Sequence, residues 1–278
     1  MAQQKAHAFD LSNPDLVSVY DEIPLWSAPF GLTLLEKVRL KPGMTVLDIG
    51  CGTGFPLLEL AQRLGDTCRI YGIDPWSAAL DRLRLKMRQY EVHNVQLFND
   101  VAENMSFADG LFDLVVSNVG FNNVTDQERV ISNCAKACKH GAQIILTVNL
   151  PDTMNLFYEI FESVLRDAGK DDEVKVMRAH VHEKRRPLEE LTFLIEGAGF
   201  MISEIIEHSF RMRFLNGTCF LNHYFIRLAF MESWRNILTP TDRDLVFELL
   251  EQRLNEVAAR EGELNLSIPY ACIIGEKS

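Results

Sequence analysis

The sequence predicts an α/β protein with a doubly wound, mostly parallel sheet, and two observations lead to this fold class. From residue 41 onward, short apolar β-type runs alternate with amphipathic helical stretches. This alternation is typical of parallel strands joined by crossover helices that cover both faces of a sheet. Hydrophobic residues make up 47% of the 278 residues, enough core for one large α/β domain with an insertion.

Seven strands are expected along the chain. The first runs straight into a glycine loop, and the second ends at Asp74. The last one has the sequence LNLSIPYACII and reaches almost to the C-terminus. In chain order the strands are expected over residues 44–49, 68–73, 94–98, 112–118, 143–149, 200–213 and 264–274.

Helices are expected between the strands, over residues 56–65, 76–90, 125–139, 151–168 and 188–196. Thr125–Glu128 has the sequence of a capping box, which starts a helix, and Gly141 is expected to end that helix. The helix that starts after Pro187 is closed by the run Gly197–Phe200.

The most informative stretch runs from Val46 to Gly54, with the sequence VLDIGCGTG. Its three glycines allow backbone conformations that a Cβ forbids and let a ligand approach closely. Asp48 is expected at the end of the first strand, with its carboxylate directed into the crevice above the sheet. The nicotinamide and flavin fingerprint G-x-G-x-x-G requires a third glycine at the position of Phe55, so this loop departs from it.

The G-x-G-x-G spacing, with an acid two residues before the first glycine, resembles motif I of the Rossmann-like (class I) methyltransferases that depend on S-adenosylmethionine (SAM). A dinucleotide has a pyrophosphate that needs the N–H groups of a helix terminus, whereas SAM has an ammonium group that an acid can pair with. The resemblance covers residues 40–150 well and the remainder by architecture only. It implies SAM as the cofactor and S-adenosylhomocysteine as its product. The cofactor-binding residues that it implies are Asp48, Gly50, Cys51, Gly52, Gly54, Asp74, Pro75, Trp76, Asp100, Val101, Ala102, Asn118 and Val119.

Each part of the cofactor has an expected partner. A carboxylate at Asp74 can accept both ribose hydroxyls. The family often places an apolar side chain at the position of Trp76 against the adenine, and a place in the core is the alternative. An acid at the position of Asp100 holds the adenine amino group, but the loop here has one extra residue, so the backbone of the next two residues is the alternative. Asn118 and Val119 would lie beside the methionine end.

The family ends its sheet with an antiparallel strand inserted between strands five and six, a role that residues 264–274 suit. We therefore expect one methyltransferase domain over residues 1–278. Its parts are an N-terminal cap segment (1–40), a Rossmann-like core (41–214 and 262–278) and a helical insertion (215–261) between strands six and seven. The insertion is far longer than a hairpin needs, and its sequence predicts helices over about 218–236 and 241–260.

The insertion region is rich in aromatic residues. Seven fall within 25 residues, where the average of 9% predicts two or three. Aromatic side chains line small-molecule pockets and help to exclude water, so the insertion is a candidate lid; packing onto the sheet is the alternative. The seven are Phe210, Phe214, Phe220, Tyr224, Phe225, Phe230 and Trp234.

A catalytic base is not assigned by the sequence. A base is needed only where the acceptor is protonated at the working pH. Many relatives have a histidine shortly after strand four, but here that run is GFNNV. Weak candidates are Tyr20, His182 and His223, with Asp21, His180 and His208 as further titratable groups. Cys51 is interpreted as a packing residue in the loop.

One cationic cluster, Arg178–Arg186, stands out in an acidic chain. If it were extended, alternate residues would face the same side and could hold a substrate carboxylate or phosphate; a solvated loop is the alternative. Metal binding by its H-x-H pair is disfavoured because no third ligand is indicated, and no metal is expected.

The net charge of −11 repels phosphate backbones and argues against a nucleic-acid substrate. No apolar stretch has the length of a signal peptide core or a membrane span, so a soluble, cytoplasmic protein is expected. The six cysteines show no C-x-x-C pair and no disulfide framework. The predicted function is methyl transfer from SAM to a small molecule. The alternatives are an NAD(P)-dependent oxidoreductase and a non-catalytic SAM-binding regulatory module.

Overall fold

The computed structural model describes residues 12–21 and 26–278, except for the side chains of residues 16 and 19–21. Contacts between residues divide this part of the chain into two compact units. The sheet unit comprises residues 12–150, 185–208 and 270–278, and the helical unit comprises residues 151–184 and 209–269. The division groups residues 151–184 with the insertion, whereas the sequence placed them in the core; the sequence-based boundaries stay a prediction.

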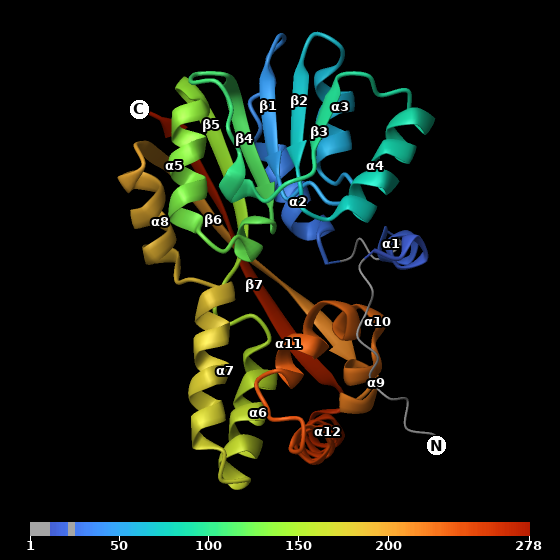
Figure 1. The fold of residues 1–278 in the computed structure, drawn as a ribbon. Helices are drawn as coiled ribbons and strands as arrows, with labels where there is room; N and C mark the ends of the chain where they lie inside the picture. The colour runs from blue at the N-terminus through green and yellow to red at the C-terminus, as the bar shows by residue number, and fades with distance from the viewer. Residues whose placement is uncertain (1–11, 22–25) are drawn as a thin grey trace. The chain divides into compact units, whose positions relative to one another are not determined.

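The seven strands form one sheet in the order β3-β2-β1-β4-β5-β7-β6, shown in Figure 1. The first five pair in parallel, and β7 pairs with β5 in the antiparallel sense. This confirms the predicted doubly wound sheet and the antiparallel last strand between strands five and six. The strands are β1 Thr45–Ile49, β2 Arg69–Ile73, β3 Val95–Phe98, β4 Phe112–Asn118, β5 Cys138–Asn149, β6 Phe200–Phe214 and β7 Leu264–Lys277.

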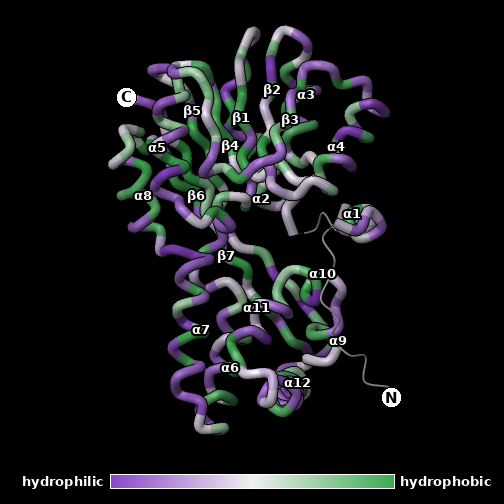
Figure 2. Tube along the Cα trace, viewed as in Figure 1, coloured by the Kyte–Doolittle hydropathy of each residue, from purple (hydrophilic) through white to green (hydrophobic). Residues whose placement is uncertain are grey.

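Helices cover both faces of the sheet in the sheet unit, and the central strands between them are mostly hydrophobic (Figure 2). One apolar cluster joins the sheet to α2 (Ala28–Lys37), α3 (Leu57–Leu64) and α4 (Ser77–Gln89). A second cluster joins the other face to α5 (Gln127–Ala137) and α8 (Leu188–Gly197). Helix α1 (Pro14–Asp21) contacts α4, and two short 3₁₀ turns, η1 (Ala102–Asn104) and η2 (Phe121–Asn123), follow β3 and β4.

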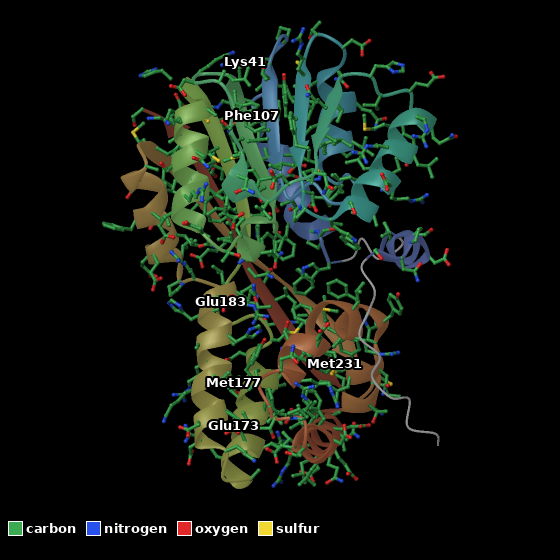
Figure 3. The ribbon with its side chains drawn as sticks, viewed as in Figure 1. Lys41, Phe107, Glu173, Met177, Glu183 and Met231 are labelled. Carbon is green, nitrogen blue, oxygen red and sulfur yellow. The ribbon has the colours of Figure 1, made fainter. Side chains whose placement is uncertain are left out.

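The loop between β3 and β4 adds aromatic packing to the sheet. Phe107, labelled in Figure 3, packs edge-on against Phe98 and Phe112, with ring centroids 5.2 Å and 5.0 Å apart. Tyr71 of β2 joins the same group at 5.9 Å from Phe107. Edge-on pairs of this kind add stability beyond the burial of their area, so they hold the loop that carries Asp100 on the sheet.

The predicted ends of α5 were wrong by a few residues. Asp126, one residue later than expected, is the N-cap, and its carboxylate accepts the N–H of Arg129 at 2.9 Å. The helix ends at Ala137 and β5 begins directly at Cys138. Gly141, which was expected to end the helix, has a φ of 77° and lies inside β5, where the pairing with β4 is irregular. It permits a bulge.

The helical unit contains α6 Asn155–Asp167, α7 Asp171–Lys184, α9 Gly217–Asn222, α10 Tyr224–Ile226, the π-helix η3 Arg227–Met231, α11 Glu232–Arg235 and α12 Arg243–Glu261. The single helix predicted over 218–236 was wrong, because the chain is extended at His223 (ψ 131°) and follows a π-helical turn after it. Residues 178–184 were expected to be extended or a loop, but they belong to α7.

The aromatic residues of the insertion form a core within the helical unit. The fully buried ring of Trp234 stacks on Phe157 at 4.1 Å and on Phe230 at 5.4 Å. Its indole N–H donates a hydrogen bond to the Tyr158 hydroxyl at 2.9 Å. For Trp234, packing is therefore the better description than the lining of a pocket. Among the described residues, no helix has the length and apolar character needed to cross a membrane.

Candidate functional site

The three glycines of the loop after β1 have positive φ angles, but their surroundings differ. A Cβ on Gly50 would lie 2.8 Å from the Cα of Gly120, and one on Gly54 would lie 2.5 Å from the side chain of Leu83. A Cβ on Gly52 would meet no described heavy atom within 4 Å. Gly50 and Gly54 therefore serve close packing, whereas Gly52 exposes its backbone to open space, as a ligand-binding turn requires.

Asp48 is a buried acid without a partner in the part of the chain that the structure describes. Its side chain is fully buried in β1, and neither carboxylate oxygen accepts a hydrogen bond from the described residues. Burial, and then the nearby carboxylate of Asp74, raise the pKa of Asp48 to about 8. Buried polar groups are almost always paired, so this carboxyl group fits the expected ammonium of SAM. The carboxylate is fully buried, and its direction into the crevice above the sheet stays a prediction.

Asp74, directly after β2, holds the glycine loop in place. One carboxylate oxygen accepts the N–H of Gly52 at 2.9 Å and the other accepts the N–H of Trp76 at 2.8 Å. Burial raises the pKa of Asp74, and these two N–H groups act against the shift. Each oxygen keeps a lone pair for a ribose hydroxyl. The sequence indicated the ribose role but missed the bonds to the loop.

The expected adenine partners lie after β2 and β3. Pro75 is exposed and Trp76 is half-buried directly before α4, so Trp76 is not a core residue. Asp100 is exposed, and one of its oxygens accepts the N–H of Val101 at 2.8 Å and the amide of Asn104 at 2.9 Å. The N–H of Val101 is thus already bonded, so the carboxylate of Asp100 and the backbone of Ala102 stay the candidates.

The end of β4 carries a strained residue. Val119 has a φ of 62°, which is rare for a β-branched side chain and is found mainly at functional sites. The preceding Asn118 is buried; its amide donates to the carbonyl of Ser27 at 3.1 Å and accepts the Thr147 hydroxyl at 2.8 Å. The side chain of Asn118 thus fixes the start of α2 against β4, and its side-chain oxygen and nitrogen are both already engaged.

Two buried amides near this point were not singled out by the sequence analysis. Asn122, in η2, accepts the backbone N–H of Asn149 at 3.1 Å. Asn149, the last residue of β5, is 7% exposed. The available signal was a polar residue at the end of the apolar run QIILTVN.

Of the three catalytic candidates, Tyr20 belongs to the sheet unit with these residues, and the two histidines belong to the helical unit. Tyr20 lies in α1, but its side chain is outside the described residues. His182 (exposed, in α7) and His223 belong to the helical unit. His223 lies edge-on to Phe214 at 5.4 Å, and partial burial lowers its pKa. Cys51 is buried and burial raises the pKa of its thiol, which supports packing.

The cationic cluster is largely paired. Arg178 donates to Glu162 at 2.7 Å and lowers the pKa of that carboxyl group, and Arg186 pairs with Glu128 at 2.7 Å. In the helix α7, His180 and His182 are two residues apart and do not share a face. Among the described residues there is no group of three or more His, Cys, Asp or Glu placed to hold a metal.

These site residues thus lie in, or directly after, three strands that are neighbours in the sheet. Asp48 lies in β1, Gly52 follows β1, Asp74 follows β2 and Val119 follows β4. Ligands of open α/β sheets bind at the carboxyl ends of the strands, where crossover connections diverge to opposite faces. The site therefore provides a buried acid, an open glycine backbone and a second acid at the carboxyl ends of neighbouring strands. A nucleoside with a cationic amino acid end fits this set of groups.

Comparisons with known proteins agree. Residues 46–141 match the family model of a methyltransferase domain. A demethylmenaquinone methyltransferase of Listeria welshimeri is 27% identical over 183 residues, which are 63% of this chain and 78% of that protein. The chain spans 59% of the length of a related Listeria monocytogenes protein.

Solved structures show the same fold. The YcgJ protein of Bacillus subtilis has a TM-score of 0.59 and 17% identity, with 89% of this chain and 97% of that chain covered. Phosphoethanolamine N-methyltransferase 2 of Haemonchus contortus, solved in complex with SAM, has a TM-score of 0.55 and 16% identity, with 89% and 52% covered.

Residues 46–141 thus match a methyltransferase domain, and the solved structures share the fold of the chain. These findings confirm the resemblance of the glycine motif to the class I SAM-dependent methyltransferases and agree with SAM as the expected cofactor.

Proposed function

We propose that this methyltransferase transfers the methyl group of SAM to a small-molecule acceptor with an apolar or planar part. The observation that carries the proposal is the fully buried carboxyl group of Asp48, which has no partner among the described residues and is followed by the open backbone of Gly52. The ionised form of such a buried group is costly unless a cation pairs with it.

Each site residue then has a role. When bound, SAM supplies an activated methyl carbon for an in-line displacement, so the protein mainly provides alignment and a dry site. Asp48 pairs with the ammonium group, and Asp74 accepts the ribose hydroxyls while it holds the glycine loop. Trp76 lies against the adenine, and Asp100 accepts its amino group. The backbone at Val119 lies beside the methionine end.

The acceptor is a small molecule in this proposal. The curated relatives are named demethylmenaquinone methyltransferases, which makes a demethylated quinol the first acceptor to test. The net charge of −11 disfavours nucleic acid. All six cysteines are free and five of them are buried, which supports an assignment to the reducing cytoplasm.

The test is incubation with SAM labelled at its methyl group, together with demethylmenaquinol and with a metabolite extract. Labelled product is expected. Tight SAM binding in calorimetry without transfer to any acceptor would favour a regulatory SAM-binding module instead. Binding of a nicotinamide cofactor in place of SAM would favour an oxidoreductase. Tyr20, His182 and His223 stay candidate bases, and their single variants can be compared in the same assay.

A further inference from the structure

Strand β5 presents one polar column to the face of the sheet that α2 covers. Alternate residues of a strand point to opposite faces, and Ile145 packs in the same cluster as Leu34 and Leu35 of α2. The face of β5 that α2 covers therefore carries Ile145 and three polar residues, Gln143, Thr147 and Asn149.

The first two polar residues of the column are satisfied. The amide of Gln143 donates to the carbonyl of Lys37 at 2.9 Å and its oxygen accepts the N–H of Arg39 at 3.1 Å. The hydroxyl of Thr147 donates to Asn118 at 2.8 Å. Both side chains therefore tie β5 to its neighbours in the sheet unit.

Asn149 differs from both. Its side-chain oxygen is buried and accepts no hydrogen bond from the described residues, and no described group bonds its amide nitrogen. Tyr270, directly opposite on β7, donates its hydroxyl to the carbonyl of Pro29 at 3.1 Å and also bonds to the Thr33 hydroxyl at 2.9 Å. The backbone of Asn149 is fixed by Asn122 at 3.1 Å.

A buried amide oxygen without a partner destabilises a fold, because it loses its bonds to water and gains none. Leucine has nearly the same shape and would avoid this loss. An asparagine at this position is therefore explained best by a ligand that completes its hydrogen bonds.

The position of Asn149 in the sheet indicates which part of the reaction complex it would bind. In the sheet, β2, β1, β4 and β5 are consecutive neighbours, and the first two lead to the acids assigned to the ribose and the ammonium group. The strained Val119 directly follows β4, and Asn149 is the last residue of the next strand. The ring of Phe30 is fully buried on the same face and packs 4.4 Å from the ring of Tyr270. The end of β5, beyond the strands that carry the cofactor residues, thus offers a carboxamide group.

We propose that the carboxamide of Asn149 binds the methyl acceptor, and that the acceptor has a hydroxyl group next to a second oxygen atom. A hydroxyl of the acceptor donates to the amide oxygen, and an adjacent oxygen accepts from the amide nitrogen. This inference rests on the proposed function. It makes Asn149 a residue that determines acceptor specificity and leaves cofactor binding to the acids of β1 and β2.

The test compares Asn149→Leu with the matched variant Gln143→Leu, from the same column. Since the side chain of Asn149 has no partner among the described residues, the first variant is expected to keep or raise the melting temperature, by up to about 2–4 °C. The second loses two bonds to backbone groups and is expected to melt at a lower temperature. SAM affinity, measured by calorimetry, is expected to stay unchanged in Asn149→Leu.

Methyl transfer to catechol, dihydroxynaphthalene and the metabolite extract is the functional readout. In Asn149→Leu the KM for the acceptor is expected to rise by about tenfold or more, the equivalent of one or two lost hydrogen bonds. Equal KM values in the wild type and the variant would overturn the inference alone, as would a lower melting temperature or weaker SAM binding in Asn149→Leu. Absence of transfer by the wild type to all three would overturn the proposed function and this inference together.

Discussion

Asp48 shows how a single residue can couple cofactor binding to protonation. Burial and the neighbouring Asp74 raise its pKa to about 8, so the ligand-free carboxyl group is mostly protonated at neutral pH. A cationic ammonium beside it stabilises the ionised form. Cofactor binding at this position therefore requires the release of a proton, and the titratable groups that face Asp48 are Asp74 and the thiol of Cys51.

We predict that SAM binding strengthens as the pH rises toward about 8, by up to about tenfold per pH unit. Calorimetry in buffers of different ionisation enthalpy should show the release of close to one proton at neutral pH. Asp48→Asn, which cannot ionise, is the control and should bind SAM weakly with no proton release. A wild-type affinity that does not change with pH would contradict the prediction.

The same ionisation affects the ligand-free fold. The pKa of Asp48 is raised in the folded state, from an ordinary value of 3.8 to about 8, so the folded state binds more protons than the unfolded state between these values. The contribution of Asp48 to stability is therefore lost as the pH rises from about 4 through about 8. Thermal unfolding of the wild type and of Asp48→Asn, measured across this range, should converge at low pH and diverge at high pH.

Asp74 has two tasks that one substitution removes together. Asp74→Ala is expected to lower SAM affinity about ten- to a hundredfold, since charge-assisted bonds to the ribose are lost. It should also lower the melting temperature, because the N–H groups of Gly52 and Trp76 lose their acceptors. Asp74→Asn, which keeps one acceptor oxygen, should have a smaller effect on both. Unchanged affinity in Asp74→Ala would show that no ribose lies across β2.

At the scale of the element, the glycines of the loop after β1 differ in whether they serve cofactor binding or close packing. Gly52 and Gly65 both have positive φ angles, and a Cβ on either would meet no described heavy atom within 4 Å. Alanine at each position should therefore have a similar backbone strain of about 1–2 kcal/mol. Gly52→Val, with its larger side chain, should fill the space of the cofactor.

We predict that Gly52→Ala weakens SAM binding, that Gly52→Val abolishes it, and that the control Gly65→Ala leaves it unchanged. The SAM affinity of all three variants is measured by calorimetry, and their melting temperatures show whether each variant is folded. Complete unfolding of Gly52→Val would show that Gly52 is chiefly a folding residue. Gly54→Ala should be the least stable of the alanine variants, because its Cβ would lie 2.5 Å from Leu83.

The aromatic core of the helical unit predicts a stability effect. Trp234→Ala is expected to reduce the free energy of unfolding by about 3–5 kcal/mol, because the ring is fully buried and stacks on Phe157. Trp234→Phe keeps an aromatic ring and loses the bond to Tyr158, with an expected loss of about 1 kcal/mol for that bond. Denaturant unfolding measures both. A fall in acceptor turnover without loss of stability in Trp234→Ala would instead support a pocket role for this side chain.

Elements with strong local signals could be predicted from the sequence. The strands β1 to β4 lie within about one residue of their expected bounds, because apolar runs and turn residues mark them. The break at His223 and the π-helical turn after it could not be predicted, since the flanking residues favour a helix and no glycine or proline interrupts it. The extra residues at the start of β5 have the same cause: Gly141 suggested a helix end but serves a bulge.

The site residues, too, differ in how far the sequence could predict them. Asp48 and Asp74 could be identified because their spacing from the glycines is a family motif. The bonds from Asp74 to the loop, and the missing partners of Asn149, depend on groups that folding brings together from distant parts of the chain. Such contacts have no signature in local sequence.

At the scale of the whole molecule, the described residues form two compact units rather than one. The grouping of α6 and α7 with the insertion rests on packing between helices that are about 80 residues apart, as in the contacts of α6 with α12. Sequence periodicity shows that a helix has an apolar face but not which partner covers it. All the cofactor residues predicted from the sequence belong to the sheet unit, so SAM binding should stabilise that unit first.

The proposal that residues 215–261 act as a lid gives the last prediction. Lids that close over substrates slow local opening when the substrate is bound. SAM alone should slow hydrogen exchange in the residues around Asp48 and Asp74 and leave residues 215–240 unchanged. SAM together with a transferable acceptor analogue should protect residues 215–240 as well, and should also reduce their cleavage by protease. Trp234→Phe, which keeps the aromatic core, is the control for loosening of the unit. If the acceptor gives no added protection there, while transfer occurs at the normal rate, the insertion is a structural element and the lid proposal should be abandoned.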